Sequence, residues 1–327
     1  MTAPALRTGV LGCASIAWRR VLPAFARTPE VELVAVASRD AHKAETFARR
    51  FSCEAVTGYG GLLDRPDIDA LYLPLPTGLH LEWAARALRA GKHVLVEKPM
   101  ATTRAETAEL LGLARERGLV LMENLMFVHH SQHRTVRALV DDGTIGEIRE
   151  FTAEFGIPPP APSDVRWAPE LGGGALLDMA VYPVRAARLF LGFGLSLVGA
   201  VLRIDPVRRV EVAGSVLLVS DEGVPARLAF GCERHYRTAY TLWGSEGRIV
   251  VERAFTPLHT HQPVIRVERP GRVEEITLAP DDQFRTLARE FARAALDGTD
   301  TSEYGEHALR QAELLDAIAN EARRTVL

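Results

Sequence analysis

The stretch GVLGCASIA occupies residues 9–17, where a short apolar run gives way to an amphipathic segment. Counted from Gly12, it has the spacing of the dinucleotide-binding fingerprint, with alanine at the second and third glycine positions. Glycine allows a tight turn, small residues let the backbone approach a pyrophosphate, and the amides at the helix start face its oxygens. A plain strand-to-helix turn also uses small residues, so the motif alone leaves cofactor binding open. The residues expected to contact a cofactor here are Gly12, Cys13, Ala14, Ser15 and Ile16.

Strand-like and helix-like segments alternate along the first third of the chain. Short apolar runs at 8–11, 31–37 and 70–73 predict strands, and amphipathic segments at 16–27 and 42–50 predict helices between them. A further helix over 79–91 and a strand over 93–96 continue the alternation. This βαβ pattern predicts a parallel sheet, and we assign residues 1–123 to a Rossmann domain.

After about residue 123 the pattern changes to longer alternating runs. They predict strands that turn signals such as Asp221-Glu222-Gly223 separate, and this favours an antiparallel sheet. The expected strands are 148–155, 210–219, 227–230, 239–243 and 264–267, and the expected closing helices are 283–296 and 304–324. The fold class is therefore α/β, with a second domain over 124–327 of α+β type that carries an open, mostly antiparallel sheet. The proline-rich segment 157–162 is expected to be a loop.

Composition narrows the class of protein. The 327 residues are 47% hydrophobic, enough for two buried cores, and the formal net charge is −3 without long basic runs. That balance favours neither a nucleic acid nor an anionic membrane surface as partner. With no signal-peptide pattern and no apolar run of membrane-spanning length, we expect a soluble cytoplasmic protein. The three cysteines form no Cys-x-x-Cys pair and are expected to be reduced thiols.

The end of the second predicted strand distinguishes between the two nicotinamide cofactors. An NAD enzyme usually has an acid there for the ribose 2′-hydroxyl, whereas a 2′-phosphate needs a hydroxyl and a cation. This chain has Ser38 and Arg39, and Asp40 comes two residues later than an NAD-binding acid would, where it can cap the next helix. We therefore predict NADP(H), with a merely solvated Arg39 as the alternative.

The stretch GKHVLVEKP at 91–99 resembles the glucose–fructose oxidoreductase / inositol dehydrogenase / rhizopine-catabolism (Gfo/Idh/MocA) family, for which Glu-Lys-Pro at a strand end is the most specific motif. The stretches 9–17, LPLPTGLH at 73–80 and GGGALLDMAVYP at 172–183 agree with it in the same order. The resemblance implies a Rossmann domain followed by an open antiparallel sheet, with the nicotinamide between them. It also implies cofactor contacts by Leu75, Pro76, His80, Glu97 and Lys98.

One departure from the family pattern narrows the resemblance. Many members have Asp-x-x-x-His in the second domain, whereas this chain has Asp178 followed by Tyr182, as in sugar-ketone reductases, aldose dehydrogenases and dihydrodiol dehydrogenases. The stretches 122–133 and 240–247 are similar to the nucleotide-diphospho-hexose (dTDP-sugar) 3-ketoreductases of deoxysugar biosynthesis. This similarity implies reduction of the C3 keto group of a dTDP-linked keto-deoxyhexose, and substrate contacts by Met126 and Phe127.

The chemistry assigns roles to three residues of these motifs. Ketone reduction needs a hydride and a proton donor. Lys98, partly desolvated beside a positively charged nicotinamide, should have a lowered pKa and is the expected donor. Tyr182 would orient the carbonyl and could share the proton transfer. Asp178, four residues earlier, would lie on the same helix face and reach the same substrate. Pro183 is expected to bend that segment.

Several further polar residues are candidates for binding. Arg166 and Trp167 follow the proline-rich loop and are assigned to the cofactor, and Tyr236 and Arg237 follow a strand of the second domain and are assigned to the substrate. Either arginine could bind a diphosphate, although exposed arginines are common. Three nearby histidines lack the pattern of a metal site, so no metal is predicted. They are expected to line the substrate cleft, and they are His129, His130 and His133.

Two alternatives to a sugar 3-ketoreductase remain at this point. One is an NADP-dependent aldose dehydrogenase, for example for xylose, or a trans-dihydrodiol dehydrogenase, which would share Lys98 and Tyr182. The other is a non-catalytic NADP-binding regulator, which would have no reason to keep Lys98, Asp178 and Tyr182 together. A broad sheet with helices on one side leaves an apolar face, so we expect a homodimer or homotetramer through the C-terminal sheet.

Overall fold

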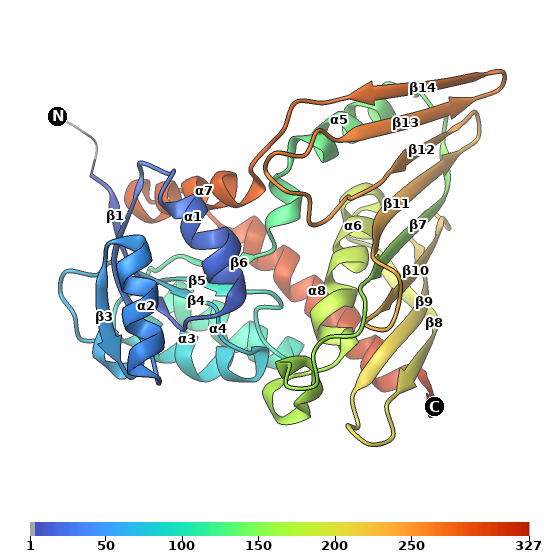
Figure 1. Cartoon of the computed structure of the whole chain (residues 1–327). Helices are drawn as coiled ribbons and strands as arrows, with labels where there is room; N and C mark the ends of the chain where they lie inside the picture. Colours follow the sequence, from blue (N-terminus) through green and yellow to red (C-terminus); the bar gives the residue numbers. More distant parts are fainter. Residues whose placement is uncertain (1–3, 327) are drawn as a thin grey trace. The chain divides into compact units, whose positions relative to one another are not determined.

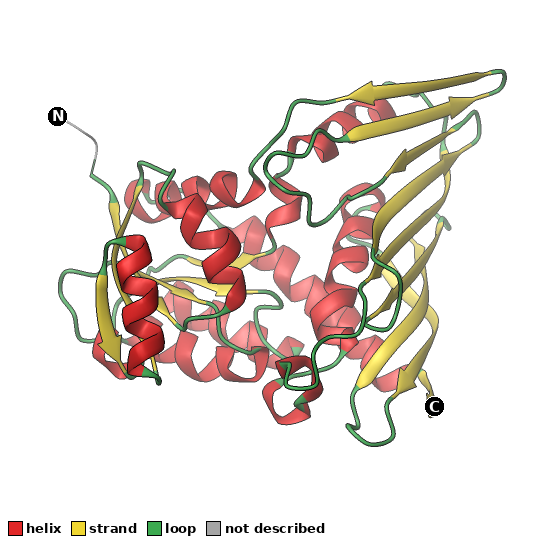
Figure 2. Cartoon of the chain, in the orientation of Figure 1, coloured by secondary structure: helices red, strands yellow, loops and turns green. Residues whose placement is uncertain are grey.

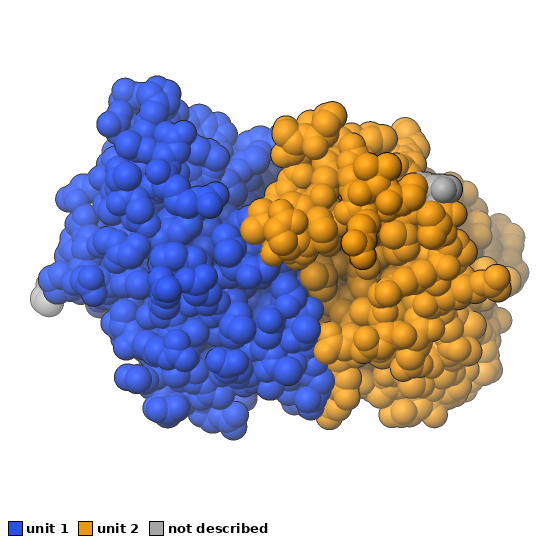
Figure 3. Space-filling model, turned by 90° about the horizontal axis from the view of Figure 1, so that it is seen from below, with its two compact units in different colours: residues 1–125, 284–309 blue, residues 126–283, 310–327 orange. Residues whose placement is uncertain are grey.

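The computed structural model describes residues 4–326 and divides the chain into two compact units. The first unit contains residues up to 125 together with 284–309, and the second contains 126–283 and the residues from 310 onward (Figure 3). The expected boundary at 123–124 is displaced by two residues, and the expected contiguous second domain is interrupted. Ala308 belongs to the apolar core of the first unit and Arg293 pairs with Glu30, so this late segment packs with the start of the chain.

The first unit is built on a six-stranded sheet in the order β3-β2-β1-β4-β5-β6, with every pair parallel (Figure 1). The buried apolar runs predicted from the sequence form its central strands, as expected for a parallel sheet covered on both faces. Strand β3 is too short and too exposed to give an apolar run, and the sequence did not predict it. The strands are β1 (Leu6–Leu11), β2 (Val31–Ser38), β3 (Glu54–Thr57), β4 (Ala70–Leu73), β5 (His93–Glu97) and β6 (Leu121–Asn124).

The helices of this unit begin and end at signals in the sequence. Asp40 caps α2 by accepting a hydrogen bond from the Lys43 amide, and Thr103 caps α4 in the same way from Glu106. Gly91, with φ of 77°, follows the end of α3. The helical segments are Ala17–Val21, a wide π-type turn, α1 (Leu22–Phe25), α2 (Ala41–Phe51), α3 (His80–Arg89), α4 (Arg104–Glu116) and α7 (Gln283–Asp297), and short turns lie at Gly60–Leu62 and Thr77–Leu79.

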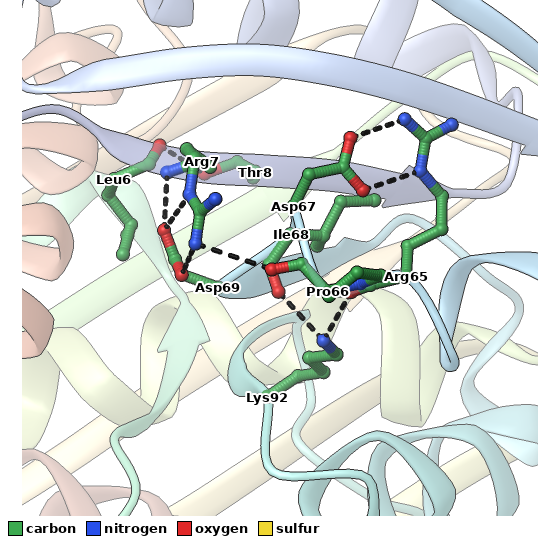
Figure 4. Close-up of polar contacts among 9 residues, drawn as sticks. All are labelled: Leu6, Arg7, Thr8, Arg65, Pro66, Asp67, Ile68, Asp69 and Lys92. Carbon is green, nitrogen blue, oxygen red and sulfur yellow. Dashed lines mark hydrogen bonds and ion pairs between the residues drawn. The ribbon is translucent and has the colours of Figure 1, made fainter.

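Ion pairs and buried donors hold the amino-terminal edge of this sheet, opposite the edge where a cofactor would bind (Figure 4). Arg7 in β1 donates to both carboxylate oxygens of Asp69, at 2.8 and 2.6 Å. The buried Lys92 ammonium donates to the carbonyl oxygens of Arg65 and Ile68 at 2.7 and 2.8 Å. These contacts fix the turn that leads into β4 and leave the carboxyl edge to the loops described below.

The second unit is built on a nine-stranded mixed sheet in the order β14-β13-β12-β11-β7-β10-β9-β8-β15. Figure 2 shows the strands in yellow. Only the pairs β7–β10 and β8–β15 are parallel. The sequence predicted five of these strands, but not the half-exposed β8, the short β12, the largely exposed β14 or the exposed β15. The strands are β7 (Ile148–Gly156), β8 (Leu195–Ile204), β9 (Glu211–Ser220), β10 (Pro225–Gly231), β11 (Arg237–Gly244), β12 (Arg248–Val251), β13 (Val264–Arg269), β14 (Arg272–Thr277) and β15 (Arg323–Val326).

Within the second unit, helices cover one face of the sheet. Helix α6 (Val181–Leu191) contacts β7 and β10, and α5 (Ser131–Asp141) lies on the same side (Figure 1). A π-type turn, Leu176–Ala180, leads into α6, and α8 (Ser302–Glu321) contributes its second half to this unit. Among residues 4–326, no helix combines the length and apolar character needed to cross a membrane.

Candidate active site

The turn after β1 has the geometry of a phosphate-binding loop. Gly12 has φ of 129°, and a Cβ built there would lie 2.9 Å from Leu75 Cδ2 and 3.3 Å from the Pro74 carbonyl oxygen. Any side chain at this position is therefore both strained and obstructed. The Cys13 thiol is buried against the Ala37 carbonyl, and Ser15 is exposed at the start of the wide turn. Backbone from residues 12–16 thus faces the carboxyl edge of the sheet, where β1 and β4 meet and the strand order reverses.

The end of β2 places a hydroxyl and two cations beside this turn. Ser38 is 6% exposed and its Oγ accepts a hydrogen bond from the Asp40 amide, while Arg39 is exposed. Burial raises the pKa of the Cys13 thiol to about 11, and the Lys43 ammonium opposes that effect, so this charge lies on the side of the turn. Sequence reasoning missed Lys43, although its position four residues after Arg39 was available as a signal.

The end of β5 contains a buried carboxylate with two donors. Tyr72 Oη donates to Glu97 Oε1 at 2.6 Å, and Asn124 Nδ2 donates to the same oxygen at 2.5 Å. Burial raises the pKa of Glu97, while Tyr72, Lys98 and Asn124 lower it. The carboxylate thus lies inside the sheet and joins neighbouring strands, and the predicted cofactor contact by Glu97 stays a prediction.

Lys98 is the residue after Glu97, and it is the only partly exposed side chain in the otherwise buried run 94–101. The bond from Lys98 to Pro99 is cis. The fully buried ring of His80 lies between two backbone carbonyl oxygens, those of Leu75 and Pro99, each 2.9 Å from a ring nitrogen. Both ring nitrogens are thus occupied by the protein's own carbonyl groups, and the predicted cofactor contact by His80 stays a prediction. The loops that carry Leu75 and Lys98 are joined through this ring.

In the second unit, Tyr182 lies in a box of aromatic rings. It is 5% exposed and stacks on Phe155 at 4.5 Å between ring centroids, with an interplanar angle of 17°. The rings of Phe127 and Phe255 lie 5.9 and 5.7 Å away. Phe127 is fully buried and Met126 is 4% exposed, and the predicted substrate contacts by both stay predictions.

Asp178 lies on the π-type turn before α6, and its carboxylate accepts a hydrogen bond from the guanidinium of Arg166. Arg166 Nε donates to Asp178 Oδ2 at 2.6 Å, and Arg166 Nη1 donates to Asp164. Asp178 and Asp164 raise the pKa of Arg166 further above its usual value. Asp178 therefore accepts a charge-assisted hydrogen bond from this guanidinium. The wide turn precedes Pro183, which has no N–H for the Met179 carbonyl, and this accounts for the distortion expected at that proline.

Close backbone packing orders the loop that holds Arg166. A Cβ at Gly173 would lie 2.7 Å from the carbonyl oxygens of both Arg166 and Ala168, so the glycines of the 172–174 run are needed for this approach. Trp167 donates from Nε1 to the Ala161 carbonyl, and its ring lies 4.1 Å from the Arg208 guanidinium carbon. The predicted cofactor contacts by Arg166 and Trp167 are not tested by these contacts and stay predictions.

Tyr236 and Arg237 lie on opposite sides of the sheet. Thr238 pairs with Phe155, whose ring stacks on Tyr182, so the Thr238 side chain lies on the face of the sheet that bears Tyr182. Side chains two residues apart on a strand share a face, so Tyr236 lies on this face too. The Tyr236 hydroxyl is 2.9 Å from Thr256 Oγ1. Arg237 points to the other face, where it pairs with two glutamates, Glu154 and Glu252. The structure thus does not bring Arg237 to Tyr182, whereas Tyr236 remains a candidate substrate contact.

The histidines near 130 have structural contacts. His133 is 2% exposed, donates from Nε2 to the Ala254 carbonyl and accepts from Tyr240 Oη, and burial lowers its pKa to about 3. His130 is fully buried and accepts the Gln132 amide hydrogen. Both rings are buried, and their expected place in the substrate cleft stays a prediction. Within residues 4–326, no three His, Cys, Asp or Glu side chains are grouped as metal ligands.

A parallel six-stranded sheet with a glycine turn after β1, and a hydroxyl and cations after β2, defines a dinucleotide-binding oxidoreductase domain. Residues 6–125 match the model of the oxidoreductase family with an NAD-binding Rossmann fold, and 133–250 match the GFO/IDH/MocA C-terminal domain. The chain belongs to the Gfo/Idh/MocA oxidoreductase family. The expected fold and family are thereby confirmed.

Relatives match the chain over nearly its whole length. It is 55% identical over 325 residues to dTDP-3,4-didehydro-2,6-dideoxy-alpha-D-glucose 3-reductase of Saccharopolyspora spinosa, covering 98% of each chain. It is 52% identical to the Actinomadura kijaniata enzyme of the same name, covering 97% of this chain and 96% of that one. The crystal structure of KijD10, a 3-ketoreductase from A. kijaniata in complex with NADP and TDP-benzene, superposes with a TM-score of 0.98 at 51% identity, covering 99% and 100% of the two chains.

Proposed function

We propose that this protein is an NADPH-dependent sugar 3-ketoreductase that reduces the C3 keto group of a dTDP-linked keto-deoxyhexose in deoxysugar biosynthesis. The observation that carries the proposal is the full-length similarity, at 55% identity, to a dTDP-3,4-didehydro-2,6-dideoxy-alpha-D-glucose 3-reductase. The chain also retains the residues that such a reaction needs at the two candidate sites. A reaction that consumes NADPH is expected to take place in the cytoplasm.

The residues of the first unit fit NADP(H). The absence of a Cβ at Gly12 lets the loop of Pro74 and Leu75 approach closely, and the backbone of 12–16 presents amides for a diphosphate. Ser38, Arg39 and Lys43 would hold the 2′-phosphate, since a hydroxyl and two cations satisfy its oxygens and balance its charge. When bound, this cofactor supplies the hydride for the carbonyl carbon.

Lys98 acts as the proton donor to the carbonyl oxygen. Lys98 belongs to a loop that Glu97 holds from inside the sheet and that the buried His80 ring holds at Pro99. A donor must be fixed within hydrogen-bond distance of the oxygen that it protonates, and these two anchors restrict the loop. The buried run on both sides leaves Lys98 as the side chain that this loop offers to a ligand.

In the second unit, Tyr182 donates a hydrogen bond to the substrate, and Asp178 accepts one. The stack on Phe155 fixes the plane of the phenol, so its hydroxyl has a defined direction. Asp178 is held by Arg166, which donates to one of its carboxylate oxygens, and its role is to accept a hydrogen bond from a sugar hydroxyl. The loss of Tyr182 should therefore impair orientation of the ketone more than cofactor binding.

Turnover on a substrate panel tests the proposal. We expect oxidation of NADPH with a dTDP-linked 3-keto-deoxyhexose and little turnover with free aldoses or dihydrodiols. Efficient NADP+-dependent oxidation of xylose or of a trans-dihydrodiol would favour the dehydrogenase alternative. Binding of NADPH without turnover of any member of the panel would favour the regulator.

We also propose that two or four copies of the chain associate through the C-terminal sheet. Strands β8, β9 and β11 carry large apolar side chains that remain partly exposed, Val201 at 44%, Leu217 at 37% and Trp243 at 58%. In the same sheet, α6 contacts β7 and β10, and the turn Leu176–Ala180 contacts β9. Apolar groups on a broad sheet are stabilised when a second copy covers them.

A further inference from the structure

The loop between β12 and β13 presents an arginine from a strained backbone. Arg253 has φ of 51°, a region that side-chain-bearing residues seldom adopt. Its side chain is exposed, and it makes no ion pair with any residue of the described range, while the neighbouring Glu252 pairs with Arg237 instead. Strain of this kind persists only where the surroundings hold it, and it often accompanies a binding function.

Buried contacts hold the loop immediately after this arginine. The Ala254 amide donates to the Thr238 carbonyl at 2.6 Å, and the Ala254 carbonyl accepts from Gln132 and His133 at 3.0 and 3.1 Å. The Phe255 carbonyl accepts from Gln283 Nε2 at 3.2 Å. Ala254 and Phe255 are fully buried. Four hydrogen bonds therefore fix the two residues that follow Arg253, and the position of its Cα is fixed with them.

This arginine lies on the same face of the sheet as Tyr182. Its guanidinium carbon is 5.9 Å from the centroid of the Tyr236 ring, whose hydroxyl bonds Thr256 on the face that bears Phe155 and Tyr182. Phe255, two residues after Arg253, packs in the aromatic box at 5.7 Å from the Tyr182 ring. The same loop therefore carries Phe255, which packs against Tyr182, and Arg253, whose charge is not balanced by an ion pair among the described residues.

We propose that Arg253 determines specificity by binding the diphosphate of the sugar nucleotide, with the Tyr236 and Thr256 hydroxyls as neighbouring donors. The proposal rests on the function proposed above. A guanidinium presents five N–H donors in a planar fork that matches phosphate oxygens. Arg166 and Arg237 are each held by two carboxylates, whereas Arg253 has its charge available for an anion. The pre-formed loop lowers the entropy lost on binding.

Binding of dTDP to the full-length protein tests this assignment. The variants are Arg253→Asn, since asparagine tolerates positive φ, and Arg253→Lys, which keeps the charge without the fork. The matched control is Arg272→Asn, an exposed arginine of β14 that pairs with Glu274. Calorimetry would give the Kd for dTDP and for thymidine, and fluorescence the Kd for NADPH. Equal thermal midpoints of all variants would show that they are folded.

We expect Arg253→Asn to weaken dTDP binding by about 10- to 100-fold, Arg253→Lys to weaken it less, and Arg272→Asn to leave it unchanged. Thymidine and NADPH affinities should stay at wild-type values. Unchanged dTDP binding by Arg253→Asn, or a loss of NADPH affinity in its place, would overturn the assignment while leaving the proposed function intact. Failure of the wild-type protein to bind dTDP would instead overturn the proposed function as well.

Discussion

Removal of one hydroxyl group beside Glu97 is expected to destabilise the first unit. Tyr72 is fully buried and its hydroxyl donates to the Glu97 carboxylate at 2.6 Å. Tyr72→Phe keeps the ring and its edge contact with Phe25 at 5.7 Å, so the change removes only this donor. A hydrogen bond to a charged group contributes about 1.5 to 3 kcal/mol. We expect a loss of that size in the free energy of unfolding at neutral pH.

The pH dependence of this loss follows from the pKa of Glu97. Burial raises that pKa, and the Tyr72 hydroxyl lowers it, so the substitution raises it further. A carboxyl with a raised pKa in the folded state contributes stability below its unfolded pKa of about 4.3, and this stability is lost as pH rises through the folded pKa. The destabilisation by Tyr72→Phe should therefore be small while Glu97 is protonated in both folded proteins, and it should grow as pH rises through the folded pKa of Glu97 in the wild type, which lies above about 4.3.

Guanidinium denaturation from acidic to neutral pH, followed by tryptophan fluorescence, measures this effect. Tyr59→Phe is the matched control, because Tyr59 makes an edge contact with Trp83 and its hydroxyl has no hydrogen bond among the described residues. The control should change the free energy of unfolding by less than about 0.5 kcal/mol at every pH. If Tyr72→Phe cost no more than the control, or cost the same at every pH, Glu97 would not be a buried carboxylate stabilised by this donor.

The remaining predictions concern catalysis, cofactor choice and assembly. Lys98→Ala should lower kcat far more than it weakens NADPH binding, and near-wild-type kcat would assign the proton to another donor. Tyr182→Phe should be milder than Tyr182→Ala in kcat/KM, because the ring still fills its aromatic box; equal, large losses would make the phenol the essential proton donor. Arg39→Asp should cut the preference for NADPH over NADH by at least roughly 10- to 100-fold, and a variant with unchanged preference would place the 2′-phosphate elsewhere. Sedimentation at micromolar concentration should give a dimer or tetramer that Trp243→Glu weakens, and a wild-type monomer would contradict the proposed sheet interface.

Local sequence patterns predicted the elements that carry their own signal, such as a run of apolar residues or a residue that caps a helix. The run at 70–73 is buried on both faces as β4, and the acid at position 40 caps α2 through the Lys43 amide. The exposed strand β15 has no apolar alternation, because it only extends the edge of a sheet beside β8. Its pairing partner is more than 100 residues away, so no local pattern could indicate it.

Side-chain roles in the candidate site were harder to predict because they depend on contacts between distant segments. The motif around Glu97 indicated a site, but only the fold shows that Tyr72 and Asn124 turn its carboxylate inward. Arg237 was plausible as a ligand in sequence, and the pairing of β11 with β7 places it with Glu154 on the other face. Arg253 gave no signal, since its backbone conformation and the buried anchors beside it are properties of the folded loop.

The position of isotope after reaction tests the central claim most directly. The purified protein would be incubated with NADPH deuterated at the transferable position of nicotinamide carbon 4 and with a dTDP-linked 3-keto-deoxyhexose, and the product examined by NMR. The account predicts one deuterium on carbon 3 of the sugar and loss of the keto group there. Deuterium on another carbon, or no transfer while a free aldose is oxidised with NADP+, would contradict it.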